Sequence, residues 1–188
     1  QIYRDLGERP SDVDTILLFK LIQKFGWNFI DHIQGMFAIA LYHKSEKIIK
    51  LYRDSSGQKC LYYRVDSHGF HFGSEIKGIL SLPNASRTID PLSLQLTLGI
   101  GYLPGNRTLV RDVYKIMPSE EITYQLQTKK LTAKLFDAHS KNYYGEMSPQ
   151  EVMHSTIEEH LQSKRDLSIN LSGGLDSSLI FYEAVMSG

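Results

Sequence analysis

The sequence predicts an α+β protein. A helix near the N-terminus is followed by several short strands separated by turns, and a glycine-rich loop lies between an apolar run and a helix near the C-terminal end. The 188 residues are 41% hydrophobic and carry no formal net charge, a composition typical of a globular protein. This length is sufficient for one large domain, or for one domain and part of another.

The same composition excludes several classes of function. The chain has no cluster of basic residues of the kind that binds nucleic acids, and no apolar run long enough to cross a bilayer. We therefore expect neither a nucleic acid nor a membrane as a partner. Cys60 is the only cysteine, so no internal disulfide is expected, which favours a reducing compartment and a cytoplasmic location.

The first part of the chain is expected to form one helix and then a series of strands. Ser11 can cap the helix, Asp12 and Asp14 suit its positive end, and Gly26 ends it. The almost wholly apolar run 35–42 is typical of a strand that is covered on both faces. Further strands are expected at 47–53, 60–65 and 69–73, with a short helix at 75–80.

The remainder of the chain is less regular up to about residue 144. We expect a helix at 91–98, strands at 121–125 and 131–136, and a linker at 141–146. Ser148-Pro149-Gln150-Glu151 is a capping box with proline at the first helical position, and it predicts a helix to about residue 163. The run Leu167–Leu171 is expected to form a strand in front of the glycine loop.

The loop Ser172-Gly173-Gly174-Leu175-Asp176-Ser177-Ser178 has the features of an anion site. Adjacent glycines allow a tight turn with several N–H groups pointing one way, and a helix N-terminus adds unpaired donors. Three serine hydroxyls can donate to the same phosphate. No lysine follows the glycines, so this is not the P-loop of common nucleotide-binding proteins. The pattern S-G-G-x-D-S is similar to the PP-loop of ATP enzymes that release pyrophosphate; an ordinary serine-capped turn is the alternative.

Several motifs, taken in order, resemble the glutamine-dependent asparagine synthetases. They are Ser11-Asp12, Gly35-Met36-Phe37-Ala38-Ile39-Ala40-Leu41, Arg53-Asp54, Leu61-Tyr62-Tyr63, Phe72-Gly73-Ser74-Glu75, Tyr102-Leu103-Pro104-Gly105 and the glycine loop. The resemblance covers most of the chain. It implies that residues 1–144 form a glutamine amidotransferase domain, an N-terminal-nucleophile αββα sandwich whose first part is missing. Residues 145–188 would begin a truncated α/β ATP-binding domain.

The resemblance also implies a reaction, two cofactors and a set of site residues. Glutamine would be hydrolysed in the first domain, and its ammonia would attack an aspartyl-adenylate in the second, giving asparagine, AMP and pyrophosphate. ATP and Mg²⁺ are the expected cofactors. Asp12 would bind the α-amino group of glutamine, with Gln1 as a second candidate, and Asp176 would act through Mg²⁺. The residues expected to hold ATP and pyrophosphate are Leu171, Ser172, Gly173, Gly174, Leu175, Asp176, Ser177 and Ser178.

The chain departs from the family pattern in ways that keep alternatives open. It starts with Gln1, without the N-terminal cysteine nucleophile, and the internal Cys60 cannot replace it, so we expect no catalytic residue and no activity from these residues alone. A glutamine-hydrolysing asparagine synthetase is one interpretation. An adenylating ligase without glutaminase activity that acts on another carboxylate is the second, and a non-catalytic binding protein that keeps the fold is the third. The resemblance leaves a homodimer open.

Overall fold

The computed structural model describes residues 14–83, 85–136, 145–163 and 166–187. The chain divides into two compact units, residues 1–140 and 141–188, and each is described by itself below. The predicted boundary at residues 144 and 145 lies at the edge of the undescribed stretch 137–144, so the assignment of residues to domains stays a prediction. Among the described residues, no helix has both the length and the apolar composition needed to cross a bilayer.

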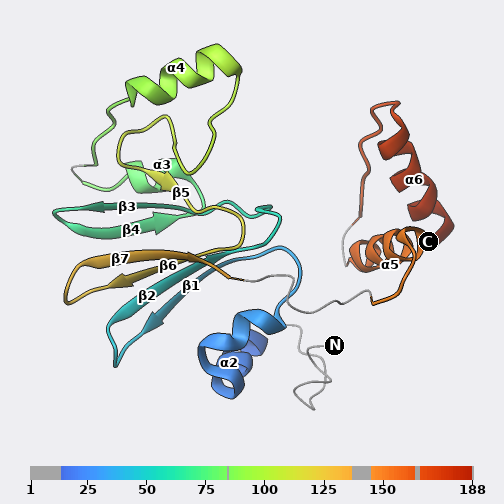
Figure 1. Ribbon diagram of the computed structural model, residues 1–188, viewed down its shortest axis with the longest axis horizontal. Helices are drawn as coiled ribbons and strands as arrows, with labels where there is room; N and C mark the ends of the chain where they lie inside the picture. The colour runs from blue at the N-terminus through green and yellow to red at the C-terminus, as the bar shows by residue number, and fades with distance from the viewer. Residues whose placement is uncertain (1–13, 84, 137–144, 164–165, 188) are drawn as a thin grey trace. The chain divides into compact units, whose positions relative to one another are not determined.

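Two antiparallel sheets form the centre of the N-terminal unit (Figure 1). The larger sheet has the strand order β1-β2-β6-β7, with bounds Ala38–His43, Ile48–Arg53, Glu120–Gln125 and Lys130–Leu135. The smaller has the order β4-β3-β5, with bounds Gly69–Gly73, Tyr62–Asp66 and Tyr114–Lys115.

Helices cover the outer faces of the two sheets. Helix α2 (Asp14–Phe25) and the 3-10 helix η1 (Gly26–His32) pack on the larger sheet, and α3 (Ile76–Leu80) packs on the smaller one. Helix α4 (Pro91–Ile100) lies on the same side of the sheets as α3 (Figure 1). The layers run helix, sheet, sheet, helix, so the predicted α+β, αββα architecture is confirmed.

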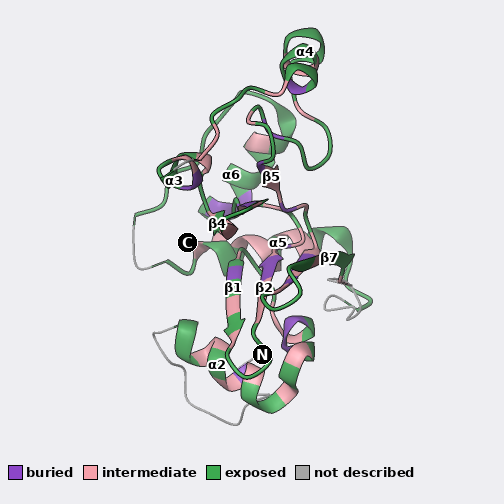
Figure 2. Ribbon diagram, turned by 90° about the vertical axis from the view of Figure 1, so that its left-hand side faces the viewer, coloured by how far each residue is buried: buried purple, intermediate pink, exposed green. Residues whose placement is uncertain are grey.

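Strand β2 supplies both hydrophobic cores because its side chains alternate between the two faces of the sheet. Leu51 lies between the sheets in a buried cluster with Leu61, Tyr63, Ile116 and Ile122. The next residue, Tyr52, faces the opposite side. There it packs in a second cluster with Leu21, Phe29, Ile30 and Ile39, and the ring of Phe29 meets its ring edge-on at 5.2 Å between centroids. Figure 2 shows the buried residues of β1 and β2 in purple.

The order of elements in this unit matches the sequence prediction, with three differences. Strand β1 is an edge strand, and Ala38, Ala40 and Tyr42 are exposed on one face, so the expectation that it is covered on both faces was wrong for the described residues. An apolar run predicts burial but not the position of a strand within a sheet. Helix η1 and the two-residue strand β5 were not predicted, because both depend on packing against distant residues.

The C-terminal unit contains two packed helices, α5 (Pro149–Leu161) and α6 (Leu175–Ser187). The predicted capping box is confirmed: the N–H of Glu151 donates to Ser148 Oγ at 3.3 Å, and the N–H of Ser148 donates to the Glu151 carboxylate at 2.7 Å. The predicted strand over Leu167–Leu171 was wrong, since residues 166–172 are irregular. A strand needs a neighbour to accept its hydrogen bonds, and the described part of this unit provides none.

Candidate functional site

The glycine loop leads directly into the N-terminus of α6. The N–H of Ser178 donates to the carbonyl of Gly174 at 3.2 Å, which makes Gly174 the N-cap of the helix. The N–H groups of Leu175, Asp176 and Ser177 therefore precede the first intrahelical bond and have no carbonyl within the helix to bind. Such donors, together with the positive end of the helix dipole, are suited to a phosphate group.

The backbone turn depends on Gly173. Its φ angle of +81° lies in the left-handed region, where a side chain is disfavoured. A Cβ atom on Gly173 would meet no atom within 4 Å, so the requirement for glycine here comes from backbone conformation and not from crowding. The surrounding side chains are mostly exposed, including Leu171 at 54% and Leu175 at 82%.

The three loop serines bind the loop itself. The hydroxyls of Ser172 and Ser177 are 3.0 Å apart, and Ser172 Oγ accepts the N–H of Gly174 at 3.3 Å. The hydroxyls of Ser177 and Ser178 donate to the carbonyl of Gly174 at 3.2 and 2.9 Å. Ser172 and Ser178 are exposed and Ser177 is half-buried, and rotation about χ1 moves a serine hydroxyl between staggered positions at low energy. The three hydroxyls therefore lie close together. Each can give up its hydrogen bond within the loop and donate to a bound anion instead.

Asp176 lies in the first turn of α6, where its carboxylate interacts favourably with the helix dipole. A single exposed carboxylate beside phosphate oxygens matches the way Mg²⁺ is commonly held in nucleotide sites, so Asp176 fits the predicted role. The described residues contain no group of three His, Cys, Asp or Glu side chains that could hold a metal ion by themselves.

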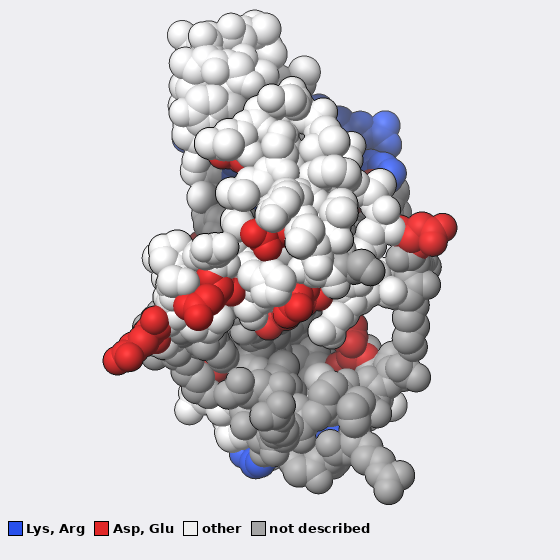
Figure 3. All heavy atoms as spheres, turned by 90° about the vertical axis from the view of Figure 1, so that its right-hand side faces the viewer, with Lys and Arg blue, Asp and Glu red and all other residues white. Residues whose placement is uncertain are grey.

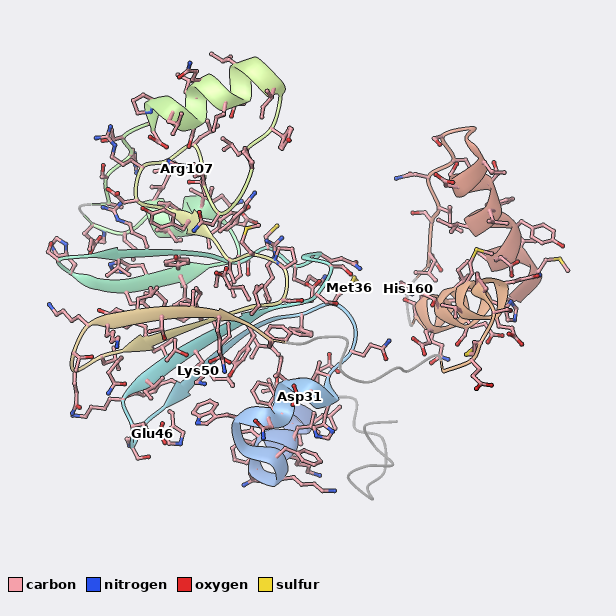
Figure 4. The ribbon with its side chains drawn as sticks, in the orientation of Figure 1. Asp31, Met36, Glu46, Lys50, Arg107 and His160 are labelled. Carbon is pink, nitrogen blue, oxygen red and sulfur yellow. The ribbon has the colours of Figure 1, made fainter. Side chains whose placement is uncertain are left out.

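The predicted glutamine-binding residues, Asp12 and Gln1, lie outside the described residues, as does the predicted helix cap Ser11. Residues that follow Asp12 in the chain line a cavity of about 340 Å³ between α2 and the start of β1. Its polar lining residues are Asp14, Thr15 and Gln34, and its remaining walls are apolar, with Met36 and Phe37 on the β1 side (Figure 4 labels Met36). The positions of Asp12 and Gln1 stay predictions.

The Arg53-Asp54 motif, in contrast, serves the architecture. Asp54 is 1% exposed, and its two carboxylate oxygens accept the N–H groups of Gln58 and Lys59, both at 2.9 Å. The Arg53 guanidinium donates to the carbonyls of Gly57, Lys59 and Ile116. Each side chain binds the backbone rather than the other side chain, and together they fix the turn between β2 and β3. Cys60 is exposed at the end of this turn.

A buried charge cluster was not found by sequence reasoning. The ammonium of Lys50 lies 2.8 Å from the Glu121 carboxylate and 4.3 Å from the centre of the Trp27 ring, on the helix-covered face of the larger sheet (Figure 4). Burial raises the pKa of Glu121, but the hydrogen bond and charge of Lys50, followed by Thr123 and Lys134, outweigh it and leave that pKa below its usual value. The pairing of β2 with β6 brings Lys50 close to Glu121, and the other members come from η1 and β7, so no local pattern could have shown the cluster.

Comparison with known proteins assigns the family. Residues 3–136, well over half of the chain, match the glutamine amidotransferase domain family. The chain belongs to this family.

Individual relatives extend the match into the C-terminal unit. The glutamine-hydrolysing asparagine synthetase 3 of Bacillus subtilis (strain 168) is 28% identical over 181 residues, which are 92% of this chain and 29% of that protein. The microcin J25-processing protein McjC of Escherichia coli is also 28% identical, over 94% of this chain and 34% of that protein. A solved structure of glutamine phosphoribosylpyrophosphate amidotransferase from B. subtilis, with ADP and GMP, has a TM-score of 0.46 and 13% identity over 99% of this chain and 41% of that one. This amidotransferase-family chain spans between 26% and 35% of the length of the curated relatives it matches.

Proposed function

We propose that the protein containing this chain forms an amide with glutamine as nitrogen donor and ATP as activating substrate. The ATP would convert a carboxylate to an acyl-adenylate with release of pyrophosphate. Aspartate is the proposed acceptor, giving asparagine and AMP. The observation that carries the proposal is the loop 172–178 in a chain of the glutamine amidotransferase family: three helix N–H groups precede the first intrahelical bond, and three serine hydroxyls lie beside them.

The proposed roles follow from the charge that develops during adenylation. A carboxylate is a poor electrophile, and the phosphoryl transfer needs donors positioned for the departing pyrophosphate. The N–H groups of Leu175, Asp176 and Ser177 and the serine hydroxyls would supply these donors. Asp176 would hold Mg²⁺, which supplies further positive charge to the phosphate oxygens. Asp12 and Gln1 would bind glutamine in the N-terminal unit.

A second candidate function is an adenylating ligase that acts on another carboxylate and does not hydrolyse glutamine. The observation in its favour is that McjC, a relative whose name does not include asparagine synthetase, is as similar to this chain as the B. subtilis synthetase is. Both candidates use the loop in the same way and differ in the acceptor and the nitrogen donor.

One assay separates these candidates. Exchange of labelled pyrophosphate into ATP would be measured with aspartate, and then with other carboxylates, in the longest natural form of the protein. Aspartate-dependent exchange supports the proposal, and exchange with a different carboxylate alone supports the second candidate. Ser177→Ala should reduce the exchange at least tenfold, whereas Ser67→Ala, in the exposed turn between β3 and β4, should leave it unchanged. Failure of the loop to bind MgATP would overturn both.

A further inference from the structure

All four charged residues of the segment 88–114 line one cavity in the N-terminal unit. The cavity has a volume of about 170 Å³ and lies between Asp90, the residue before α4, and the segment 107–114. The charged residues are Asp90, Arg107, Arg111 and Asp112. Helix α4 itself has no charged residue, and its surface, at the top of the view in Figure 3, shows neither blue nor red. The charges of this segment are therefore gathered at a single place, and the proposed chemistry uses none of them.

The backbone around the cavity is fixed without the charged side chains. Thr108 is 6% exposed, and its hydroxyl donates to the carbonyl of Val113 at 2.7 Å and accepts the N–H of Val110 at 3.2 Å. The N–H of Arg111 donates to the carbonyl of Thr88 at 2.9 Å, which joins the segment to the chain before α4. These bonds use one neutral side chain and backbone groups, so they hold the segment without help from its charges.

Two of the four charges are already paired with each other. Arg107 Nη1 lies 3.0 Å from Asp90 Oδ2, which also accepts the hydroxyl of Ser93 at 2.7 Å (Figure 4 labels Arg107). Arg111 and Asp112 are exposed, and among the described residues neither side chain has a hydrogen bond or an ion pair, not even with the other. The cavity therefore contains one neutral pair, one guanidinium that is free to bind and one carboxylate that is free to bind.

Asp112 has a backbone conformation that favours glycine. Its φ angle of +63° lies in the left-handed region, and the N–H of Val113 donates to the carbonyl of Val110 at 3.3 Å across this turn. Glycine would form the same turn with less strain, so the turn does not require the Asp112 carboxylate. The carboxylate can therefore be removed without loss of the local fold.

We propose that this cavity binds a free α-amino acid in its zwitterionic form. The ligand carboxylate accepts hydrogen bonds from the Arg111 guanidinium, whose planar fork fits a carboxylate, and the ligand ammonium donates to Asp112. A simple anion is repelled by the two aspartates and a simple cation by the two arginines, whereas a ligand with both charges matches the site. At roughly 30 Å³ for each water, the cavity has room for about five or six waters, or for a ligand the size of alanine. The site shares no residue with the predicted glutamine and ATP sites, and it does not depend on the proposed function.

The test is an NMR titration of the 188-residue chain with alanine, propionate and ethylamine. Propionate lacks the ammonium group of alanine and ethylamine lacks the carboxylate, and neither adds bulk. Alanine should give saturable shifts of the backbone amide signals of Arg111, Asp112 and Val113, and the other two compounds should bind at least about tenfold more weakly, since each loses one charge-assisted contact. Absence of saturable shifts with alanine, or equal binding of propionate, would overturn the inference.

Three variants locate the binding in the cavity. Arg111→Gln and Asp112→Gly should each weaken the binding of alanine about tenfold or more. Arg87→Gln should leave it unchanged, because Arg87 does not line the cavity and its guanidinium donates to the carbonyl of Leu80 at 3.4 Å. Urea titrations followed by Trp27 fluorescence should show that Asp112→Gly is at least as stable as the wild type. Alanine binding that survives in both cavity variants would refute the site.

Discussion

The turn after β2 and the loop before α6 are both short glycine-containing connections, yet they satisfy their polar groups in different ways. In residues 53–60, the buried Asp54 carboxylate and the Arg53 guanidinium bind backbone groups, so charged side chains hold the turn. In residues 172–178, serines at the surface bind one another and the backbone of the loop itself. The first connection stabilises the fold, and the second has hydrogen-bond donors that can bind a ligand. Bonding pattern and burial therefore separate architecture from a candidate site better than motif identity does.

The strongest test of this comparison is Asp54→Ala. The substitution removes two hydrogen bonds to a buried carboxylate, each worth about 2 kcal/mol, so the free energy of unfolding should fall by about 4 kcal/mol. Trp27 is the only tryptophan and lies in the N-terminal unit, so its fluorescence in a urea titration measures this unit. Asp54→Asn, which keeps one acceptor, should lose about half as much. A loss below about 1 kcal/mol in the alanine variant would mean that the turn does not depend on the carboxylate.

The glycines of the two connections should respond differently to alanine. Gly57 has a φ angle of +64°, and a Cβ there would lie 2.9 Å from Pro118 Cγ and 3.2 Å from Arg53 Cζ. Strain and crowding together should lower the free energy of unfolding by about 3 kcal/mol, measured by Trp27 fluorescence. Gly173→Ala meets no neighbour and should cost about 1 kcal/mol in the thermal unfolding of α6, followed by circular dichroism. Equal losses at the two sites would show that crowding at Gly57 is unimportant.

The buried pair of Lys50 and Glu121 should make the free energy of unfolding of the N-terminal unit depend on pH. Glu121→Gln leaves Lys50 without its partner and should lower the free energy of unfolding by about 2 kcal/mol at pH 7. Because the folded-state pKa of Glu121 lies below its ordinary value of 4.5, the contribution is complete above about pH 4.5 and is lost as the pH falls through the folded-state pKa. Urea titrations between pH 3 and pH 7 should therefore show a steeper acid loss for the wild type than for the variant. Parallel curves would contradict this assignment.

The smallest expected effect is that of Ser177→Ala on folding. Its hydroxyl is bonded only within an exposed loop, so the free energy of unfolding should change by less than about 0.5 kcal/mol. Thermal unfolding of α6, followed by circular dichroism, should coincide with that of the wild type. A large loss would place Ser177 with Asp54 among the structural groups and weaken the case for an exchangeable donor.

Local patterns were sufficient where the physical cause is local. The capping box at Ser148 and Glu151, the end of α2 at Gly26 and the glycine-dependent turn at Gly173 all follow from hydrogen bonding or backbone sterics within a few residues. Strand-forming runs separated by turn residues predicted β2, β3, β4 and β6 to within about two residues. The cytoplasmic location, the ATP and Mg²⁺ contacts, and the roles of Asp12 and Gln1 stay predictions, because no described contact tests them.

The α+β class, the family, most of the order of elements and the glycine loop at the N-terminus of α6 follow from the sequence alone. Tertiary structure alone decided that Arg53 and Asp54 bind backbone groups rather than each other, that Lys50 meets Glu121, and that His154 meets Glu183 across 29 residues. It also decided that β1 lies at a sheet edge and that Leu167–Leu171 does not form a strand. The physical reason is the same throughout: strand pairing and buried charge depend on partners distant in sequence, whereas turns and caps depend on neighbours.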